Sequence, residues 1–202
     1  METGRLERML PWSGVLFGIL LIGAVIASGA PSDTTDSPEK VLDHYDDGKI
    51  FIAIICLGLG TIFFLFFLGA LRKHLLAAGN ETSGVMCFAA GVVLSVGMAN
   101  FAASQFTLAN AADDKNVAVM QTLNYIDNNN FPIAVVGLCV FHLCLAWNVL
   151  STGSLPRWIG WVALVLGILC ILGPIGIIAF ILTGPFMIVV ALSLNSRSTA
   201  AA

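Results

Sequence analysis

Charged residues are scarce in this sequence of 202 residues, because only 10 % of its positions are Asp, Glu, Lys or Arg. Hydrophobic residues make up 58 %, and the mean hydropathy is +0.93. One water-soluble core cannot hide that much apolar surface, so the composition excludes an ordinary soluble domain. It indicates an integral membrane protein whose first partner is the lipid bilayer.

Features that define several other protein classes are missing as well. Nine Lys and Arg residues are spread thinly along the chain and the net charge is -3, so no basic stripe can follow a phosphate backbone, and we expect no nucleic-acid partner. The signatures of serine hydrolases, phosphate-binding loops, zinc proteases and dinucleotide-binding turns are absent. We therefore expect no enzymatic activity and no cofactor.

The cysteines do not form a disulfide framework. Their number is odd, and each lies inside a hydrophobic run, which predicts free thiols rather than disulfides. The five residues are Cys56, Cys87, Cys139, Cys144 and Cys170.

Long uncharged hydrophobic runs are abundant. About 20 helical residues cross the roughly 30 Å hydrocarbon core of a bilayer. Four runs have this length, and a longer fifth run divides near Pro174, where a helix should break. Pro31 disfavours signal-peptide cleavage after the first run, so we expect this run to remain as a helix. The sequence thus predicts an all-α polytopic membrane helix bundle, one integral membrane domain over 1–202 with six transmembrane helices at 12–30, 50–71, 84–106, 132–150, 158–173 and 177–194.

The positive residues predict the orientation of these spans. One side of the membrane receives Arg5, Arg8, Arg72, Lys73, Arg157 and Arg197. The other side receives only Lys40, Lys49 and Lys115, together with most of the acidic residues. Because cytoplasmic loops carry the excess of Lys and Arg, both termini are predicted to be cytoplasmic, in the cell membrane (the inner membrane of a bacterium).

The first external segment, 31–49, has a helical pattern of its own. Ser37 can cap a helix that begins at Pro38. The apolar residues on one side of this helix are Val41, Leu42 and Tyr45. The segment therefore predicts a short amphipathic helix on the outer surface.

The second external segment, 107–131, shows a similar pattern. Asp113 or Asp114 can cap a helix there. Apolar residues recur at helical spacing at Val119, Met120, Leu123 and Ile126. We expect a second short amphipathic helix, which could pack against the first.

Three stretches of the chain carry a resemblance to a protein family. They are SLPRWIGWVALVLGILCILGP at 154–174, WSGVLFGILLIGAVIASGAP at 12–31 and FFLGALRKHL at 66–75. The chain resembles a broad group of uncharacterised small multi-pass integral membrane proteins of actinobacteria, in which L-P-R-W-x-G-W opens the fifth span. The resemblance implies the same architecture, and it brings no assigned activity, cofactor or catalytic residue.

His142, in the stretch CVFHLC, is the one titratable side chain besides the thiols inside a predicted span, and it lies near the bilayer midplane. Its neutral ring could bond across a helix interface to Thr61, Ser95 or Thr183, which lie at similar depth. One alternative is a haem or metal ligand with Cys139 on the same helix face. Another is a proton relay or a contact to a polar ligand.

A second polar group lies toward the outer end of the third predicted span. It consists of Asn100, Ser104 and Gln105. Asn100 and Ser104 are four residues apart and share a helix face, so they could line a small pocket open to the outside. Equally, they could join helices by hydrogen bonds.

Three acidic residues of the first external segment are candidate metal ligands. Asp43, Asp46 and Asp47 could supply oxygen atoms to Ca²⁺ or another divalent ion. Their spacing is not that of a calcium-binding loop, and a solvated acidic helix face is the alternative.

These features lead to three predicted functions. The first is a non-enzymatic accessory or scaffold subunit that binds other membrane proteins or a second copy of itself, since Gly14 and Gly18 permit close helix contact. The second is a small-molecule or lipid-binding membrane protein or transporter, with a pocket among the candidate ligand-binding residues. These residues are Thr61, Ser95, Asn100, Ser104 and His142. The third is a haem or redox subunit. No Asp, Glu, Lys or Arg lies inside a predicted span, which disfavours an ion-coupled transporter.

Overall fold

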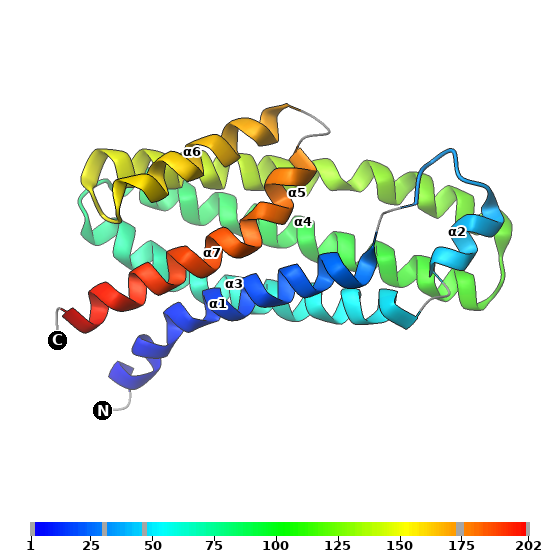
Figure 1. The fold of residues 1–202 in the computed structure, drawn as a ribbon, viewed down its shortest axis with the longest axis horizontal. Coiled ribbons are helices and arrows are strands. Elements are labelled where there is room, and N and C mark those ends of the chain that lie inside the picture. Colours follow the sequence, from blue (N-terminus) through cyan, green and yellow to red (C-terminus); the bar gives the residue numbers. More distant parts are fainter. Residues whose placement is uncertain (1–2, 30–31, 46–47, 173–175, 201–202) are drawn as a thin grey trace.

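The structure, a computed structural model, describes residues 3–29, 32–45, 48–172 and 176–200. These residues form helices and no strand (Figure 1). The helices are α1 (Thr3–Ser28), α2 (Pro38–Tyr45), α3 (Gly48–Ala77), α4 (Glu81–Asp113), α5 (Val117–Thr152), α6 (Arg157–Ile171) and α7 (Gly176–Ala200). The predicted all-α fold is confirmed for this part of the chain.

Five of these helices are long and apolar enough to cross a bilayer. They are α3, α4, α5 and the parts of α1 and α7 over Met9–Ser28 and Gly176–Ser196. Helix α6 is equally apolar but has 15 residues, so it is about 22 Å long, shorter than a hydrocarbon core of about 30 Å. The predicted break near Pro174 lies outside the described residues, and the count of six crossings stays a prediction.

The outward faces of the bundle are as apolar as its interior. The interior is packed with side chains of no measurable exposure, such as Phe64, Leu94 and Phe141. On the outside, Val96 and Val136 are 59 % and 60 % exposed. A water-soluble bundle would carry polar residues at such positions, so the surface supports an integral membrane protein with lipid as its solvent.

Glycine residues bring several helices close together. A Cβ atom on Gly97 of α4 would lie 2.6 Å from the Cα atom of Ala134 on α5, and one on Gly137 of α5 would lie 2.5 Å from the backbone nitrogen of Leu94. On α1, a Cβ atom on Gly18 would lie 2.5 Å from the carbonyl oxygen of Gly184 on α7. At these positions the small residues let the helix backbones touch directly, where larger side chains would keep them apart.

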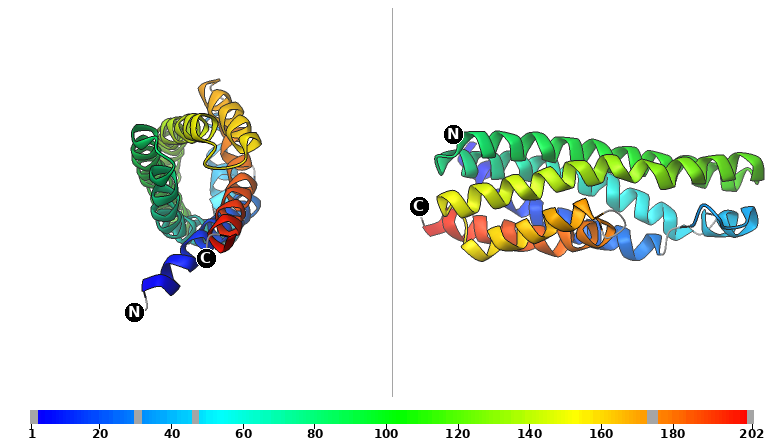
Figure 2. Two further views of the ribbon diagram at one scale, coloured as in Figure 1. Left: turned by 90° about the vertical axis from the view of Figure 1, so that its left-hand side faces the viewer. Right: turned by 90° about the horizontal axis from the view of Figure 1, so that it is seen from above.

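Helices α4 and α5 extend beyond the length that a bilayer needs. Their 33 and 36 residues correspond to about 50 and 54 Å. Figures 1 and 2 show the far ends of this hairpin beside α2, at the end of the bundle opposite to both termini. The turn between them contains Lys115 with φ 52°, and the side chain of Asn116 caps α5 by accepting a 3.3 Å hydrogen bond from the Val119 nitrogen.

The prediction of a second, separate external helix is wrong. Residues 117–131 are the first part of α5, which continues through Pro132 into the predicted span. Pro132 removes only one helical hydrogen bond, and no second breaker accompanies it. The predicted cap is also wrong, because Asp113 ends α4 and Asp114 follows it, and Asn116 is the residue that caps α5.

Helix α2 agrees with the sequence prediction. It begins at Pro38, and the Ser37 hydroxyl accepts a 3.4 Å hydrogen bond from the Lys40 nitrogen. Val41 and Tyr45 are buried. They belong to a small apolar cluster with Ile50, Leu108, Ala111, Ala112 and Met120. Helix α2 therefore packs on the ends of α4 and α5.

Candidate binding cavity

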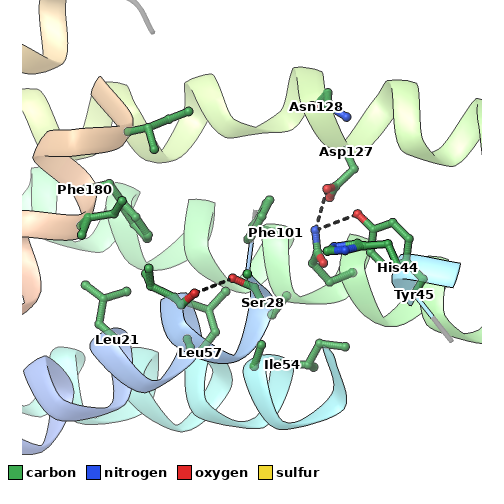
Figure 3. Close-up of a pocket in the computed structure, with 18 residues that line it drawn as sticks. Leu21, Ser28, His44, Tyr45, Ile54, Leu57, Phe101, Asp127, Asn128 and Phe180 are labelled. Atoms are coloured by element: carbon green, nitrogen blue, oxygen red, sulfur yellow. Dashed lines mark hydrogen bonds between the residues drawn. The ribbon is translucent and has the colours of Figure 1, made fainter. Parts of the chain in front are cut away.

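A cavity of about 220 Å³ lies between α1, α3, α4, α5 and α7, next to the end of α2 (Figure 3). Its lining comes from the last turns of α1 and the first turns of α7, with parts of the other helices. An apolar cavity of about 150 Å³ already accepts a benzene molecule in an engineered protein core. The volume is therefore sufficient for a small organic group.

Most of the cavity wall is hydrophobic. Leu21 of α1, Leu57 of α3 and Phe180 of α7 line one end, and Ile54 and Phe101 continue this wall toward α2 (Figure 3). None of these side chains carries a group that can form a hydrogen bond. This end can accommodate only an apolar part of a guest.

The opposite end of the cavity is polar and is built around Asp127 of α5. The Gln105 side-chain nitrogen on α4 donates a 2.6 Å hydrogen bond to Asp127 and lies 3.4 Å from the Tyr45 hydroxyl oxygen of α2 (Figure 3). Ser104, one residue earlier on α4, donates to the other carboxylate oxygen. Asp127 is only 5 % exposed and Gln105 9 %. Three helices thus place a buried carboxylate at one end of a hydrophobic cavity.

Tyr45 contributes a hydroxyl group that keeps its proton at neutral pH. Burial, and secondly the negative charge of Asp127, raise the pKa of Tyr45 to about 12. The phenol is therefore neutral under physiological conditions, and it remains both a donor and an acceptor of hydrogen bonds.

Asparagine side chains hold the segment that precedes α2 against α5. The Ser32 hydroxyl donates a 2.6 Å hydrogen bond to the Asn124 side-chain oxygen, and the Asn124 side-chain nitrogen donates to the Asp33 carbonyl (3.0 Å). One turn further, the Asn128 side-chain nitrogen donates to the Ser32 carbonyl (3.2 Å). These bonds fix α2 and therefore Tyr45 at the polar end of the cavity.

The first part of α5 buries polar residues and exposes apolar ones. Asn124 and Asp127 are 2 % and 5 % exposed, whereas Tyr125 and Ile126 are 64 % and 51 % exposed. The predicted apolar face is correct for Met120, which is fully buried, and wrong for Val119 and Ile126. The residues missed by sequence reasoning are therefore Asn124 and Asp127. Their i, i+3 spacing is a signal for a polar face turned inward.

The hydroxyl groups at midplane depth bond within their own helices. Thr61 donates to the Leu57 carbonyl (2.8 Å), and the same i−4 bond is made by the two other hydroxyls. These are Ser95, which donates to Gly91 (2.9 Å), and Thr183, which donates to Ala179 (2.7 Å).

His142 does not form the expected bond to another helix. Its Nδ1 atom lies 3.0 Å from the Leu138 carbonyl of its own helix, and its ring is fully buried. The Nε2 atom has no hydrogen-bond partner among the described residues. The prediction failed because hydroxyl groups in apolar surroundings can use their own helix carbonyls and need no partner across the interface.

The candidate ligand-binding residues do not meet in one place. Asn100 is exposed on α4, whereas Thr61, Ser95 and His142 are buried. None of these residues lines the cavity, and Ser104 reaches it only through its bond to Asp127. Ligand binding by the five predicted residues stays a prediction, while the cavity brings Gln105 together with Tyr45 and Asp127, which belong to the two predicted external segments.

The structure supplies no metal-binding cluster among the residues it describes. Asp43 is exposed on α2, and the two other predicted ligands, Asp46 and Asp47, lie outside the described residues. Cys139 points its sulfur at the Gly167 carbonyl of α6 (3.5 Å), and the five cysteines are free thiols.

No protein-family model, no curated protein and no solved structure matches this chain. The class of protein therefore follows from the fold itself, an all-helical bundle of the membrane type with five helices able to span a bilayer.

Proposed function

We propose that this protein is a non-enzymatic multi-pass membrane protein that binds a small amphipathic molecule in the cavity beside α2. One observation carries the proposal: a hydrophobic cavity ends at the buried group formed by Tyr45, Gln105 and Asp127. Binding sites for small molecules combine a largely apolar lining with a few convergent polar groups. The apolar part of the guest would contact α1, α3 and α7, and its head group would contact Asp127.

The position of the cavity supports entry from the lipid. Helix α7 begins partway along the bundle, and α4 and α5 continue past this point to α2 (Figure 1). The first residues of α7, Ile177 and Ile181, line the cavity, whereas α6 contributes no lining residue. The guest would therefore reach the cavity between the end of α1 and the start of α7.

We further propose that the protein lies in the cell membrane with both termini in the cytoplasm. The charge distribution supports this orientation. Arg72, Lys73 and Arg157 belong to the helix ends that lie near both termini, and they are exposed. The α2 end carries exposed acidic residues, including Asp33, Glu39, Asp43, Asp113 and Asp114. The excess of positive charge would mark the cytoplasmic side.

A native mass spectrum of the protein, extracted mildly from its own membrane, tests the binding proposal. We expect one reproducible small mass on the wild-type chain. Ala102, which is buried on the cavity wall, and its exposed neighbour Ala103 provide matched variants. Ala102→Leu fills part of the cavity and should lose the small mass, whereas Ala103→Leu should keep it. Equal retention by both variants, or no small mass on the wild type, would contradict the proposal.

An accessory or scaffold role remains the second proposed function, and the same spectrum tests it. The side of α1 that carries Gly14 and Gly18 packs against other helices of the bundle. A Cβ atom added to Gly14 would lie within 3 Å of Phe67 and Ala191, and one added to Gly18 would lie within 3 Å of the Gly184 carbonyl. A partner would have to use another surface, such as the apolar outer faces. A stoichiometric protein mass on the wild-type chain would favour this role.

A further inference from the structure

We infer that the polar end of the cavity recognises a positively charged amine head group, so that the guest is a small cationic amphiphile. This inference rests on the proposed binding function and adds the chemical class of the ligand. It begins with the carboxyl group of Asp127, which is the one acidic side chain among the described residues that line the cavity.

Asp127 has no cationic partner among the residues that the structure describes. The ion pair found in that part of the chain joins Lys40 to Asp36, on the outer surface. The hydrogen bonds to Asp127 come from Ser104, Gln105 and the Tyr45 hydroxyl, which are neutral donors. A buried carboxylate without a counter-ion is destabilising, and a cation in the cavity would offset this cost.

The geometry leaves room for such a contact. Ser104 bonds to one carboxylate oxygen of Asp127 and Gln105 to the other. Each ionised oxygen can accept about two hydrogen bonds, so an ammonium group entering from the cavity finds acceptor positions that are still open. The Tyr45 oxygen, next to Gln105, offers a further acceptor.

The rest of the lining disfavours an anionic guest. No Lys or Arg is among the described residues that line the cavity, where the His44 ring beside Tyr45 is the one basic side chain, and a carboxylate or phosphate head group would meet the carboxylate of Asp127. The exposed acids near α2, including Asp33 and Asp43, would in addition raise the local concentration of cations. The cavity thus selects by charge at one end and by hydrophobicity at the other.

Photo-crosslinking with matched probes tests this inference. The full-length protein is placed in nanodiscs of phosphatidylcholine, which has no net charge. Three probes share one diazirine-bearing eight-carbon chain and end in a primary amine, a primary alcohol or a carboxylate. The fraction of protein that each probe labels is measured by intact mass. Labelling counts as saturable when excess octylamine or octanol displaces the probe. We expect the amine to label at about tenfold lower concentration than the alcohol, and the carboxylate to give no saturable labelling.

Variants separate the possible results. Asp127→Asn should lower amine labelling to the level of the alcohol. Equal labelling of the wild type by amine and alcohol, lost in Ala102→Leu and kept in Ala103→Leu, would overturn the cationic ligand and leave the cavity function intact. Two results would overturn both the cationic ligand and the cavity function. One is the absence of saturable labelling with all probes, and the other is saturable labelling that is unchanged in Ala102→Leu. If Asp127→Asn fails to fold, the wild-type comparison of amine with alcohol still decides the question.

Discussion

The side-chain nitrogen of Gln105 donates a 2.6 Å hydrogen bond to the carboxylate of Asp127, across the interface between α4 and α5. Both residues are buried, although around Gly97 and Gly137 α4 and α5 meet through glycine and apolar side chains. The bond therefore places a polar link in the extended hairpin, at the end of the cavity. The Asp127 carboxylate thus receives a hydrogen bond from Gln105, which the sequence shows only as part of a polar group near the end of a predicted span.

Removal of Gln105 should destabilise the protein. Gln105→Leu leaves the buried Asp127 carboxylate with one donor fewer, and hydrogen bonds to charged groups contribute about 1.5 to 3 kcal/mol. We expect a loss of this size in the free energy of unfolding, measured by denaturant titration in detergent micelles. Gln121→Leu, on the exposed face of α5, is the matched control and should change stability by less than about 0.5 kcal/mol. Equal effects of the two variants would show that the bond contributes nothing.

Asn148 forms a second polar centre, at the end of α5 far from the cavity. Its side-chain nitrogen donates to the Ser83 hydroxyl (2.8 Å) and the Asn80 carbonyl (3.2 Å), and its oxygen accepts from the Ser154 hydroxyl (3.0 Å). Asn148→Leu would remove several hydrogen bonds between buried polar groups, so we expect a loss on the order of 2 to 4 kcal/mol in unfolding free energy.

The control for this prediction is Asn129→Leu in the same helix. Asn129 is exposed and donates only to the Tyr125 carbonyl of its own helix (2.8 Å). Thermal unfolding of the two variants in the same detergent should therefore separate them by several degrees. Similar melting temperatures would contradict the role of Asn148 as a link between α3, α4 and the segment before α6.

The close approach of α4 and α5 predicts a strong effect of one added methyl group. In Gly97→Ala the new Cβ atom would lie 2.6 Å from backbone of Ala134, which cannot move aside as a side chain could. Overpacking of this kind costs about 1 to 3 kcal/mol. Gly58→Ala in α3 meets no atom within 4 Å and should be neutral or stabilising by up to about 1 kcal/mol, through helix propensity. Unfolding titrations that rank the two variants in the opposite order would refute the packing.

Part of this architecture was predictable from the sequence, because it depends on local patterns. Long apolar runs predict helices, and five of these are long and apolar enough to span a bilayer. Ser37 with Pro38 predicts the start of α2, which is confirmed. Such signals lie within a few residues of the element that they define. They need no knowledge of which helices are neighbours.

The candidate site was predictable only in part, because it depends on contacts between distant segments. Gln105 was recognised as polar, but its partner Asp127 lies 22 residues away and appeared as one more external acid. The helical spacing around Met120 predicts an apolar side turned inward, whereas Tyr125 and Ile126 face outward and Asp127 inward. Only the assembled bundle shows which side of α5 faces the cavity.

The orientation of the protein is testable by cysteine labelling in intact cells. Thr35, near α2, and Thr82, at the start of α4, are exposed at opposite ends of the bundle. A membrane-impermeant maleimide should label Thr35→Cys in intact cells and Thr82→Cys only after permeabilisation. The unmodified chain, whose five cysteines are buried or half-buried, measures the background. The reverse pattern would place the termini outside the cytoplasm.

The unusual environment of His142 predicts that an apolar ring can replace it. The imidazole lies between Phe141 and Phe186, with ring centroids 5.5 and 5.6 Å away, and its buried Nε2 atom has no hydrogen-bond partner among the described residues. An unpaired buried polar atom costs about 1 to 3 kcal/mol, so His142→Phe should unfold at an equal or higher denaturant concentration than the wild type.

His74→Phe is the matched control, since the half-buried His74 ring bonds to the Ser154 carbonyl at 2.8 Å and its replacement should be destabilising by about 1 kcal/mol. A pronounced loss of stability in His142→Phe would show that Nε2 is paired in the native membrane. If an absorption band of the protein as purified from its own membrane disappeared at the same time, His142 would be a haem ligand, as the third predicted function requires. Unchanged stability without any such band would identify the histidine as a packed residue of the core and leave Asp127 as the polar group that serves the cavity.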